Sequence, residues 1–331
     1  MSQEPKVTIC CITYNQEKYI RQALDGFVAQ KTNFPFIVKI GDDCSSDNTK
    51  KIIEEYAKKY PEIIKPIYQK ENTKIYGNLC DVYSDINTPY VAICEGDDYW
   101  TDENKLQKQV DFLEKNPQYS TCFHPVKVIF ENKEARNYIY PKHKKEFTFE
   151  KLLYSNFIQT NSVMYRWNFR NERIEKYLPK NIMPIDWYIH LAHAKTGKIG
   201  YINKVMAAYR RQPKGVWYNS FKDNIKLNLE YGIEKINFHR LVWERFAEKS
   251  DEYLYNVLLP TLKEVLQAHF AYGNFDKCIK IKEENLELME KIIPINSSKK
   301  LRHKYKKYKK LFFIFISLAI VLSLVLLWRI L

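Results

Sequence analysis

The sequence predicts an α/β protein in which a mostly parallel sheet is flanked by helices, followed by a helical region and an apolar C-terminal segment. Strand and helix patterns alternate over the first 130 residues, which is typical of a parallel sheet with helices on both faces. Residues 220–293 have helical periodicity almost throughout. Residues 311–328 carry no charge and no proline. A chain of 331 residues is long enough for two domains.

The elements of the first half follow from their side-chain patterns. Residues 7–13 form a β-branched and apolar run that is typical of a strand buried on both faces. Residues 16–30 place apolar side chains at helical spacing, and residues 36–40 form a second strand. Ser46 or Asp47 is expected to cap the next helix. The series continues with a strand, a helix and a strand, expected at residues 63–68, 77–86 and 90–94.

The pattern changes after residue 150. We expect three further strands, at residues 160–165, 199–202 and 205–209. We also expect a helix at residues 186–196 and a polar turn at residues 211–215. In the helical region that follows, apolar side chains recur on one face, which indicates packing within the protein. The alternatives are contact with a second copy of the chain, giving a homo-oligomer, and docking of another partner. No group of residues in that region has catalytic spacing.

Shifts in composition divide the chain into four parts. We expect a folded domain at residues 1–218 and a helical region at residues 219–295. A basic linker is expected at residues 296–310, followed by a membrane-spanning helix at residues 311–331. The eighteen residues 311–328 reach about 27 Å as a helix, which is close to the hydrocarbon thickness of a bilayer. A buried core helix is the alternative. The lack of charged side chains on any face favours the membrane.

The net charge of +14 is concentrated directly before this apolar segment. Residues 299–310 hold eight Lys or Arg and no acid, which leaves +6 for the rest of the chain. A nucleic-acid-binding protein would spread its basic residues over a folded face, so we expect no nucleic-acid partner. The N-terminus does not resemble a signal peptide, and basic residues favour the inner side of a membrane. We therefore expect a single-pass protein of the plasma membrane whose folded part is cytoplasmic.

Acidic side chains follow the predicted strands and begin a predicted helix. Asp42 and Asp43 follow the second strand, and Glu95-Gly96-Asp97-Asp98 follows the strand at 90–94. We expect Asp186, in residues 183–187 (MPIDW), to end a further apolar strand just where a helix starts. Because the carboxyl ends of parallel strands meet at one edge of a sheet, we expect these acids to lie together. Carboxylates held together favour a cation, and their oxygens favour Mg²⁺ or Mn²⁺. Capping of the following helices is the alternative role.

Three stretches of the chain, taken together, resemble inverting glycosyltransferase family 2. They are residues 7–16 (VTICCITYNQ), 42–49 (DDCSSDNT) and 95–100 (EGDDYW), and their order and spacing are those of the family. A fourth stretch, from Asp186-Trp187 through Tyr209-Arg210-Arg211 to Gly215-Val216-Trp217, resembles the family's acceptor half. The resemblance covers residues 5–218 and implies the GT-A fold for this part of the chain.

The resemblance also implies roles for individual residues. The nucleotide pocket would be lined by Thr13, Tyr14 and Asn15, and Asp43 would accept a hydrogen bond from uracil. Glu95 would reach the ribose, Asp97 would bind the metal with Asp98 as an auxiliary ligand, and Asp186 would be the catalytic base. The candidates for binding the diphosphate are Arg210 and Arg211. Where the family often carries a histidine this chain has Gln212, and whether Gln212 takes over its role is open.

The implied activity is the metal-dependent, inverting transfer of a sugar from a nucleotide-diphosphate donor, expected to be a UDP-sugar. Inversion takes one displacement at the anomeric carbon, so a base and charge stabilisation of the leaving diphosphate suffice. The acceptor is expected to be a cell-surface glycan or a lipid-linked intermediate at the cytoplasmic face of the membrane. The alternative is a catalytically degenerate relative that serves as a scaffold in a membrane complex for glycan assembly.

Overall fold

The computed structural model describes residues 3–131, 136–141, 146–212 and 224–290. The chain divides into two compact units, residues 1–180 with 184–218 and residues 181–183 with 219–331. The predicted basic linker and membrane-spanning helix lie outside the described residues. Among the residues that are described, no helix combines the length and the apolar character needed to cross a bilayer.

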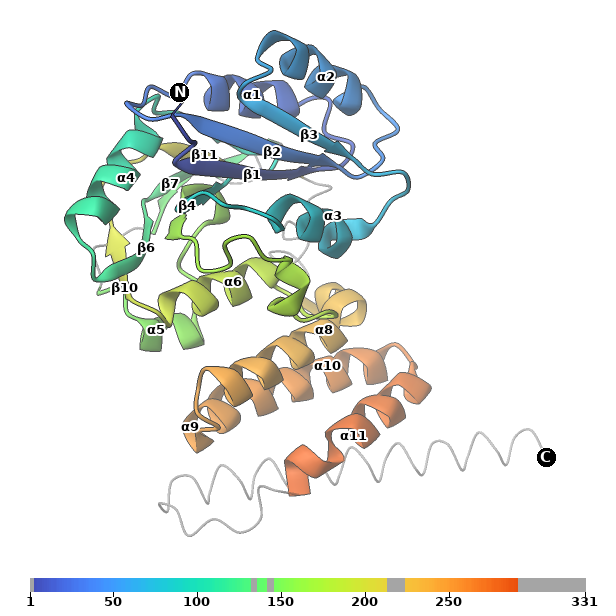
Figure 1. Cartoon of the computed structure of the whole chain (residues 1–331). Helices are drawn as coiled ribbons and strands as arrows, with labels where there is room; N and C mark the ends of the chain where they lie inside the picture. The colour runs from blue at the N-terminus through green and yellow to red at the C-terminus, as the bar shows by residue number, and fades with distance from the viewer. Residues whose placement is uncertain (1–2, 132–135, 142–145, 213–223, 291–331) are drawn as a thin grey trace. The chain divides into compact units, whose positions relative to one another are not determined.

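The first unit is built on a seven-stranded sheet with the strand order β10-β6-β9-β4-β1-β2-β3 (Figure 1). Its strands are β1 (Val7–Thr13), β2 (Phe36–Asp42), β3 (Ile64–Tyr68), β4 (Tyr90–Ile93), β6 (Tyr119–Phe123), β9 (Met164–Arg166) and β10 (Lys198–Tyr201). All neighbours in this sheet are parallel except β9, which is antiparallel to both β4 and β6. The predicted α/β class is confirmed, and the sheet is mixed.

A second, four-stranded sheet with the order β5-β11-β7-β8 was not expected from the sequence. Its strands are β5 (Tyr99–Trp100), β7 (Val126–Phe130), β8 (Tyr138–Tyr140) and β11 (Ala207–Arg211). The expected strand at 205–209 thus extends through Arg210 and Arg211, which pair in parallel with Ile129 and Phe130. A two-residue strand such as β5 is too short to have a detectable periodicity. The sequence therefore does not predict the sheet that contains it.

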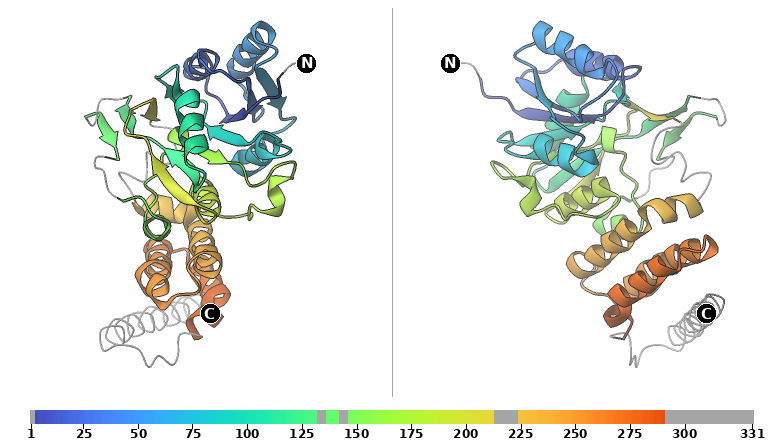
Figure 2. Two further views of the ribbon diagram at one scale, coloured as in Figure 1. Left: turned by 60° about the vertical axis from the view of Figure 1, so that its left-hand side comes forward. Right: turned by 90° about the vertical axis from the view of Figure 1, so that its right-hand side faces the viewer.

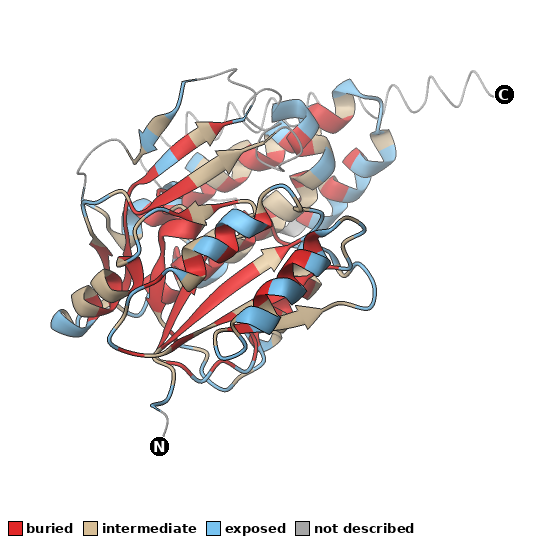
Figure 3. Ribbon diagram, turned by 90° about the horizontal axis from the view of Figure 1, so that it is seen from above, coloured by how far each residue is buried: buried red, intermediate tan, exposed pale blue. Residues whose placement is uncertain are grey.

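Helices cover both faces of the large sheet, with α1 and α2 on one face and α3 on the other (Figure 1). The helices of this unit are α1 (Ile20–Val28), α2 (Thr49–Lys59), α3 (Lys74–Tyr83), α4 (Lys105–Lys115), α5 (Phe149–Tyr154) and α6 (Ile185–Ala194). Figure 3 shows the central strands buried, while the helices keep one face exposed. Burial of apolar side chains between these layers is the main source of stability for such a fold.

One expected strand is replaced in part by a turn. Residues 160–165 begin as the 3₁₀ turn η1 (Thr160–Ser162), and the strand starts only at Met164. The Ser162 hydroxyl donates to the Gln159 carbonyl at 2.6 Å, and the Ser162 amide donates to the same carbonyl at 2.9 Å. These local hydrogen bonds compete with strand pairing and explain the difference.

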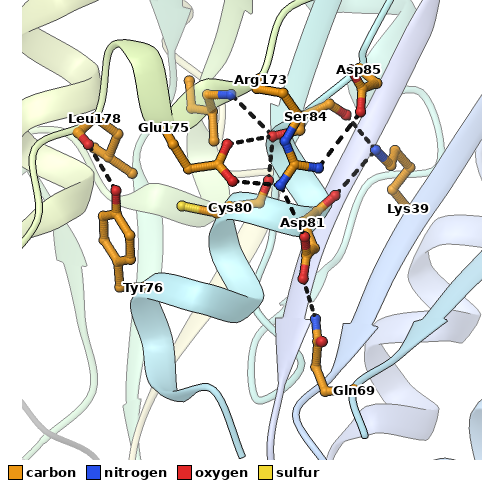
Figure 4. A network of polar contacts seen from close by, with 11 residues as sticks. Lys39, Gln69, Tyr76, Cys80, Asp81, Ser84, Asp85, Arg173, Glu175 and Leu178 are labelled. Atoms are coloured by element: carbon orange, nitrogen blue, oxygen red, sulfur yellow. Dashed lines mark hydrogen bonds and ion pairs between the residues drawn. The ribbon is translucent and has the colours of Figure 1, made fainter.

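A polar network joins the C-terminal end of α3 to the 3₁₀ turn η2 (Ile174–Lys176) (Figure 4). The Lys39 ammonium donates to the carbonyl of Ser84 at 2.6 Å, and the Ser84 hydroxyl accepts the Ile174 amide at 3.0 Å. Arg173 pairs with Glu175 at 2.5 Å and with Asp81 at 3.4 Å. The Arg173 side chain is 49% exposed, so each of its ion pairs stabilises the fold by about 1 kcal/mol at most. The network fixes the segment that precedes α6 against the sheet.

The second unit is helical in its described part, as the periodicity predicts. It contains α8 (Asn224–Arg245), α9 (Asp251–Tyr253), the π-helical turn η3 (Leu254–Leu258), α10 (Leu259–Ala271) and α11 (Phe275–Glu290). Helix α10 contacts both α8 and α11, and the helices of this unit pack together (Figure 2). A Cβ atom at Gly232 of α8 would lie 2.6 Å from the Val265 side chain of α10, so these helices approach closely. Residues 181–183 join this unit because the Met183 amide donates to the Glu234 carbonyl at 3.2 Å.

Candidate active site

The C-terminal ends of β1 and β2 form one wall of the candidate site. Thr13 and Asp42, the last residues of the two strands, are paired in register. In the loops that follow, the Asn15 amide donates to the Ser45 hydroxyl at 2.9 Å, and the Ser46 amide donates to the Asn15 side chain at 2.8 Å. Asn15 has a φ of 52°, a conformation that asparagine adopts more readily than most residues. These reciprocal hydrogen bonds fix the two loops against each other.

The residues predicted to bind the nucleotide lie together on this wall, but their side chains differ in exposure. The Tyr14 side chain is 48% exposed, whereas Thr13 is buried and donates its hydroxyl to the Gln16 side chain at 2.7 Å. Asp43 is also buried, and its Oδ1 accepts hydrogen bonds from the amide and the hydroxyl of Thr73, at 2.7 and 2.9 Å. Asp43 therefore also anchors the chain immediately before α3.

The acidic loop that follows β4 packs closely on this wall through Gly96. Its amide donates to the Ile12 carbonyl at 3.1 Å. A Cβ atom at position 96 would lie 2.4 Å from the Gln16 side-chain oxygen and 2.7 Å from the Thr13 hydroxyl. Only glycine allows this approach without displacing those groups. The loop that carries Glu95 and Asp97 is therefore held directly against the end of β1.

The adjacent residues Asp97 and Asp98 direct their carboxylates to different partners. Asp97 Oδ2 accepts a hydrogen bond from the Gln212 side-chain amide at 2.8 Å. Asp98 is 2% exposed, and its Oδ1 accepts the Arg210 backbone amide at 2.8 Å. Asp98 thus joins the acidic loop to β11, and Asp97 is the carboxylate that lies beside Gln212. The role of Asp98 as an auxiliary metal ligand stays a prediction.

Arg210 stabilises the acidic loop. Its Nε donates to the Asp97 carbonyl at 2.8 Å, and its Nη2 donates to the Gln22 side chain at 2.8 Å. The guanidinium carbon lies 4.8 Å from the ring centre of Tyr19 and 5.3 Å from that of Tyr99, in cation–π geometry. Arg210 therefore positions Asp97 in this structure, and its predicted contact with a diphosphate, like that of Arg211, stays a prediction.

The electrostatics of the acidic loop fit a divalent cation. Burial and neighbouring carboxylates raise the pKa values of Glu95 and Asp98, and burial raises the pKa of Asp97. A bound cation would relieve this cost, and carboxylate and amide oxygens are the ligands that Mg²⁺ and Mn²⁺ prefer. Within the described ranges, no group of three His, Cys, Asp or Glu side chains converges as a ligand set. Asp97 would hold such an ion largely by itself, which suits ions that retain water and bind substrate phosphates.

Asp186 lies in the first turn of α6, where two side chains hold one of its oxygens. Oδ2 accepts the Thr160 hydroxyl at 3.1 Å and the Asn156 side-chain amide at 3.5 Å. Burial raises the pKa of Asp186, and the hydrogen bonds it accepts oppose that increase. The charge of Asp186 also contributes to raising the pKa of Glu95.

Several residues that shape the site were missed from the sequence. They are Gln22, Asn156 and Thr160. None belongs to a recognisable motif, and each acts on a partner that is distant along the chain. The only sequence feature near Thr160 is the polar run at residues 160–162, which lies within the segment predicted as a strand at 160–165.

The chain is similar in sequence to bacterial proteins. Residues 8–215 match the family described as glycosyl transferase family 2. The uncharacterized protein Rv1520 of Mycobacterium tuberculosis is 46% identical over 224 residues, which cover 66% of this chain and 63% of that protein. The putative teichuronic acid biosynthesis glycosyltransferase TuaG of Bacillus subtilis is 25% identical over 243 residues, covering 72% of this chain and 93% of TuaG. The match therefore spans less than two thirds of the mycobacterial relative.

Two solved structures share the fold at low sequence identity. The structure of S. aureus TarS 1–349 in complex with UDP has a TM-score of 0.51 and 18% identity, with 80% of each chain covered. The mannosyltransferase PcManGT from Pyrobaculum calidifontis, in complex with GDP-Man and Mn²⁺, has a TM-score of 0.53 and 14% identity. That similarity covers 97% of this chain and 87% of PcManGT. Both similarities support a GT-A-like fold.

Proposed function

Because the chain belongs to glycosyl transferase family 2, we propose that it transfers a sugar from a nucleotide-diphosphate donor to an acceptor hydroxyl. One observation carries the proposal. The acidic loop with Asp97 is packed against Thr13 and Gln16 at the end of β1, and the 3₁₀ turn η1 joins Asp186, through Thr160, to Trp100 beside that loop, through Asn161. This arrangement supports Asp97 as the metal ligand and Asp186 as the base of one site, in a fold whose ligands bind at the carboxyl ends of the strands. A scaffold protein would not need this arrangement.

The proposed mechanism is inverting. Asp186 accepts the proton of the acceptor hydroxyl as the hydroxyl oxygen bonds to the anomeric carbon, and the bond from that carbon to the diphosphate breaks in the same step. Asp97, beside Gln212, would hold Mg²⁺ or Mn²⁺, which when bound neutralises charge on the leaving diphosphate. Arg210 keeps the Asp97 loop in place during the reaction.

We propose a UDP-sugar as the donor. In the nucleotide pocket, the exposed Tyr14 ring can stack on a base, and Asp43 can accept a hydrogen bond from the uracil N–H while Thr73 holds its other oxygen. The similarity to TarS in complex with UDP agrees with this donor, and the similarity to PcManGT in complex with GDP-Man makes a GDP-sugar the first competitor.

We expect purified protein to bind and turn over one class of nucleotide sugar in the presence of Mn²⁺ or Mg²⁺. The measurement is nucleotide release from UDP-, GDP- and dTDP-sugars with each metal and with EDTA, after a thermal-shift screen for binding. Turnover that disappears with EDTA supports the proposal. Donor binding without any turnover, in the presence of a range of acceptors, would favour the degenerate scaffold instead.

We further propose that residues 311–328 anchor the protein in the plasma membrane, with the catalytic unit cytoplasmic and the basic residues 299–310 on anionic lipid. The apolar run and its basic flank support this placement, which would give access to lipid-linked or cell-surface glycan acceptors. Removal of residues 296–331 should release the protein from the membrane fraction while donor binding is retained. Truncated protein that still pellets with membranes after a high-salt wash would contradict the anchor.

A further inference from the structure

The 3₁₀ turn η1 connects the two halves of the candidate site. Its first residue, Thr160, donates its hydroxyl to Asp186 at 3.1 Å. Its second residue, Asn161, accepts the indole N–H of Trp100 and donates its side-chain amide to the Ala208 carbonyl, both at 2.9 Å. Trp100 is the second residue of β5, which follows the acidic loop, and Ala208 lies on β11, the strand that carries Arg210. The turn therefore fixes the base relative to the elements that hold Asp97.

Within this turn, the Thr160 hydroxyl selects one oxygen of the base. Thr160 and Asn156 both donate a hydrogen bond to Asp186 Oδ2, and the hydrogen bond from Thr160 is the shorter of the two. A carboxylate fixed at one oxygen cannot rotate freely about its terminal torsion, so its second oxygen keeps one direction. A general base is effective only when the accepting oxygen lies within hydrogen-bond reach of the proton that it removes.

We propose that Thr160 is a positioning residue for the transfer reaction: its hydroxyl holds Asp186 Oδ2 so that Oδ1 meets the acceptor hydroxyl. The proposal rests on the role of Asp186 as the base. It assigns to Thr160 no contact with either substrate.

The same hydrogen bond affects the protonation of Asp186. A bond donated to a carboxylate favours its charged form, so loss of the Thr160 hydroxyl should raise the pKa of Asp186. The titratable groups that interact with Asp186 come from three further elements: Glu95 after β4, Tyr83 on α3 and Tyr165 on β9. Removal of the Thr160 hydroxyl changes none of these groups. Activity that requires charged Asp186 is lost as the pH falls through its pKa, so the acid limb of the kcat profile should move to higher pH.

The test compares Thr160→Val, Thr160→Ser and Ser162→Ala in the full chain. Valine keeps the size of threonine but removes the hydroxyl, whereas serine keeps the hydroxyl. Ser162→Ala is the matched control, because the Ser162 hydroxyl donates to the Gln159 carbonyl in the same turn and not to the base. We expect Thr160→Val to lower kcat about tenfold at neutral pH with an unchanged KM for the donor. Thr160→Ser should restore most of the activity, and Ser162→Ala should keep the wild-type pH profile.

A second measurement does not depend on turnover. Carbon NMR of protein labelled at aspartate carboxyl groups gives the Asp186 titration, with its signal identified by its loss in Asp186→Asn. A higher Asp186 pKa in Thr160→Val, with no change in Ser162→Ala, supports the proposal. An unchanged titration, or kcat losses in Thr160→Val and Ser162→Ala that follow their melting temperatures alike, overturns it. If instead the titration shifts while Asp186→Asn retains transfer, the hydrogen bond exists but the base assignment fails.

Discussion

Replacement of Asp97 by alanine is expected to abolish metal-stimulated transfer, with a loss in kcat/KM on the order of 10³-fold or more. The physical reason is that the bond between the sugar and the nucleoside diphosphate breaks slowly unless the negative charge that develops on the diphosphate is neutralised. The described residues provide no three-carboxylate or histidine cluster that could replace Asp97 as a metal ligand. The mutant should also lose the metal dependence of donor binding, because the substrate phosphates and Asp97 would share the ion.

The measurement is kcat/KM together with Mn²⁺ titration calorimetry in the presence of UDP. Asp111→Ala is the matched control: it removes a carboxylate of the same kind from α4, where it accepts a hydrogen bond from Gln107 on the same helix. This control should keep both activity and metal affinity. Metal-stimulated activity that survives in Asp97→Ala would exclude Asp97 as the ligand, and Asp98 would become the first candidate.

The sequence predicts the strand ends and their acids well, because both depend on local patterns. β-branched runs specify β1 and β2, and a strand that is buried on both faces must end where polar residues begin. Acidic residues at such ends are then placed at one edge of the sheet by topology alone. For this reason Asp43, Glu95 and Asp97 can be selected from the sequence alone. Asp186 lies in the first turn of α6 and not at the end of a strand, so the same argument does not place it.

The partners of these acids could not be predicted, because they depend on contacts between distant parts of the chain. Arg210 illustrates the difficulty, since a cationic residue in a motif suggests a phosphate ligand. Within the protein, its guanidinium contacts the Asp97 carbonyl and Gln22, and neither neighbour is recognisable from the pattern around residue 210. Asp98 is a second example. Its neighbour Asp97 has the same side chain, but only Asp98 accepts the backbone of β11.

Replacement of Asp186 by asparagine is expected to lower kcat by about 10²- to 10⁴-fold and to leave donor affinity nearly unchanged. Asparagine preserves the shape of the side chain but cannot accept a proton from the acceptor hydroxyl. A carboxylate in the first turn of α6 could also serve only to stabilise the helix through its dipole. In that case kcat would stay close to the wild-type value and only the melting temperature would fall.

Glu150→Gln is the control for the helix effect, because Glu150 lies in the first turn of α5. Its pKa is lowered by hydrogen bonds from its own backbone and from Thr148, so its charge stabilises the fold above its unfolded pKa. The control variant should lose a little stability, and its kcat should remain unchanged.

Asp186→Asn should not lose stability as Glu150→Gln does. This difference separates the role of Asp186 as a base from a role in stabilising the helix. Burial raises the pKa of Asp186, so the folded protein binds this proton more tightly than the unfolded chain does. Stability is then lost as the pH rises from the unfolded pKa of about 3.9 through the higher folded value, and at neutral pH the charged side chain costs free energy. The neutral asparagine removes that cost, so we expect an equal or higher melting temperature at pH 7 together with the loss of turnover. A lower melting temperature with near-normal kcat would assign Asp186 to the helix and not to the reaction.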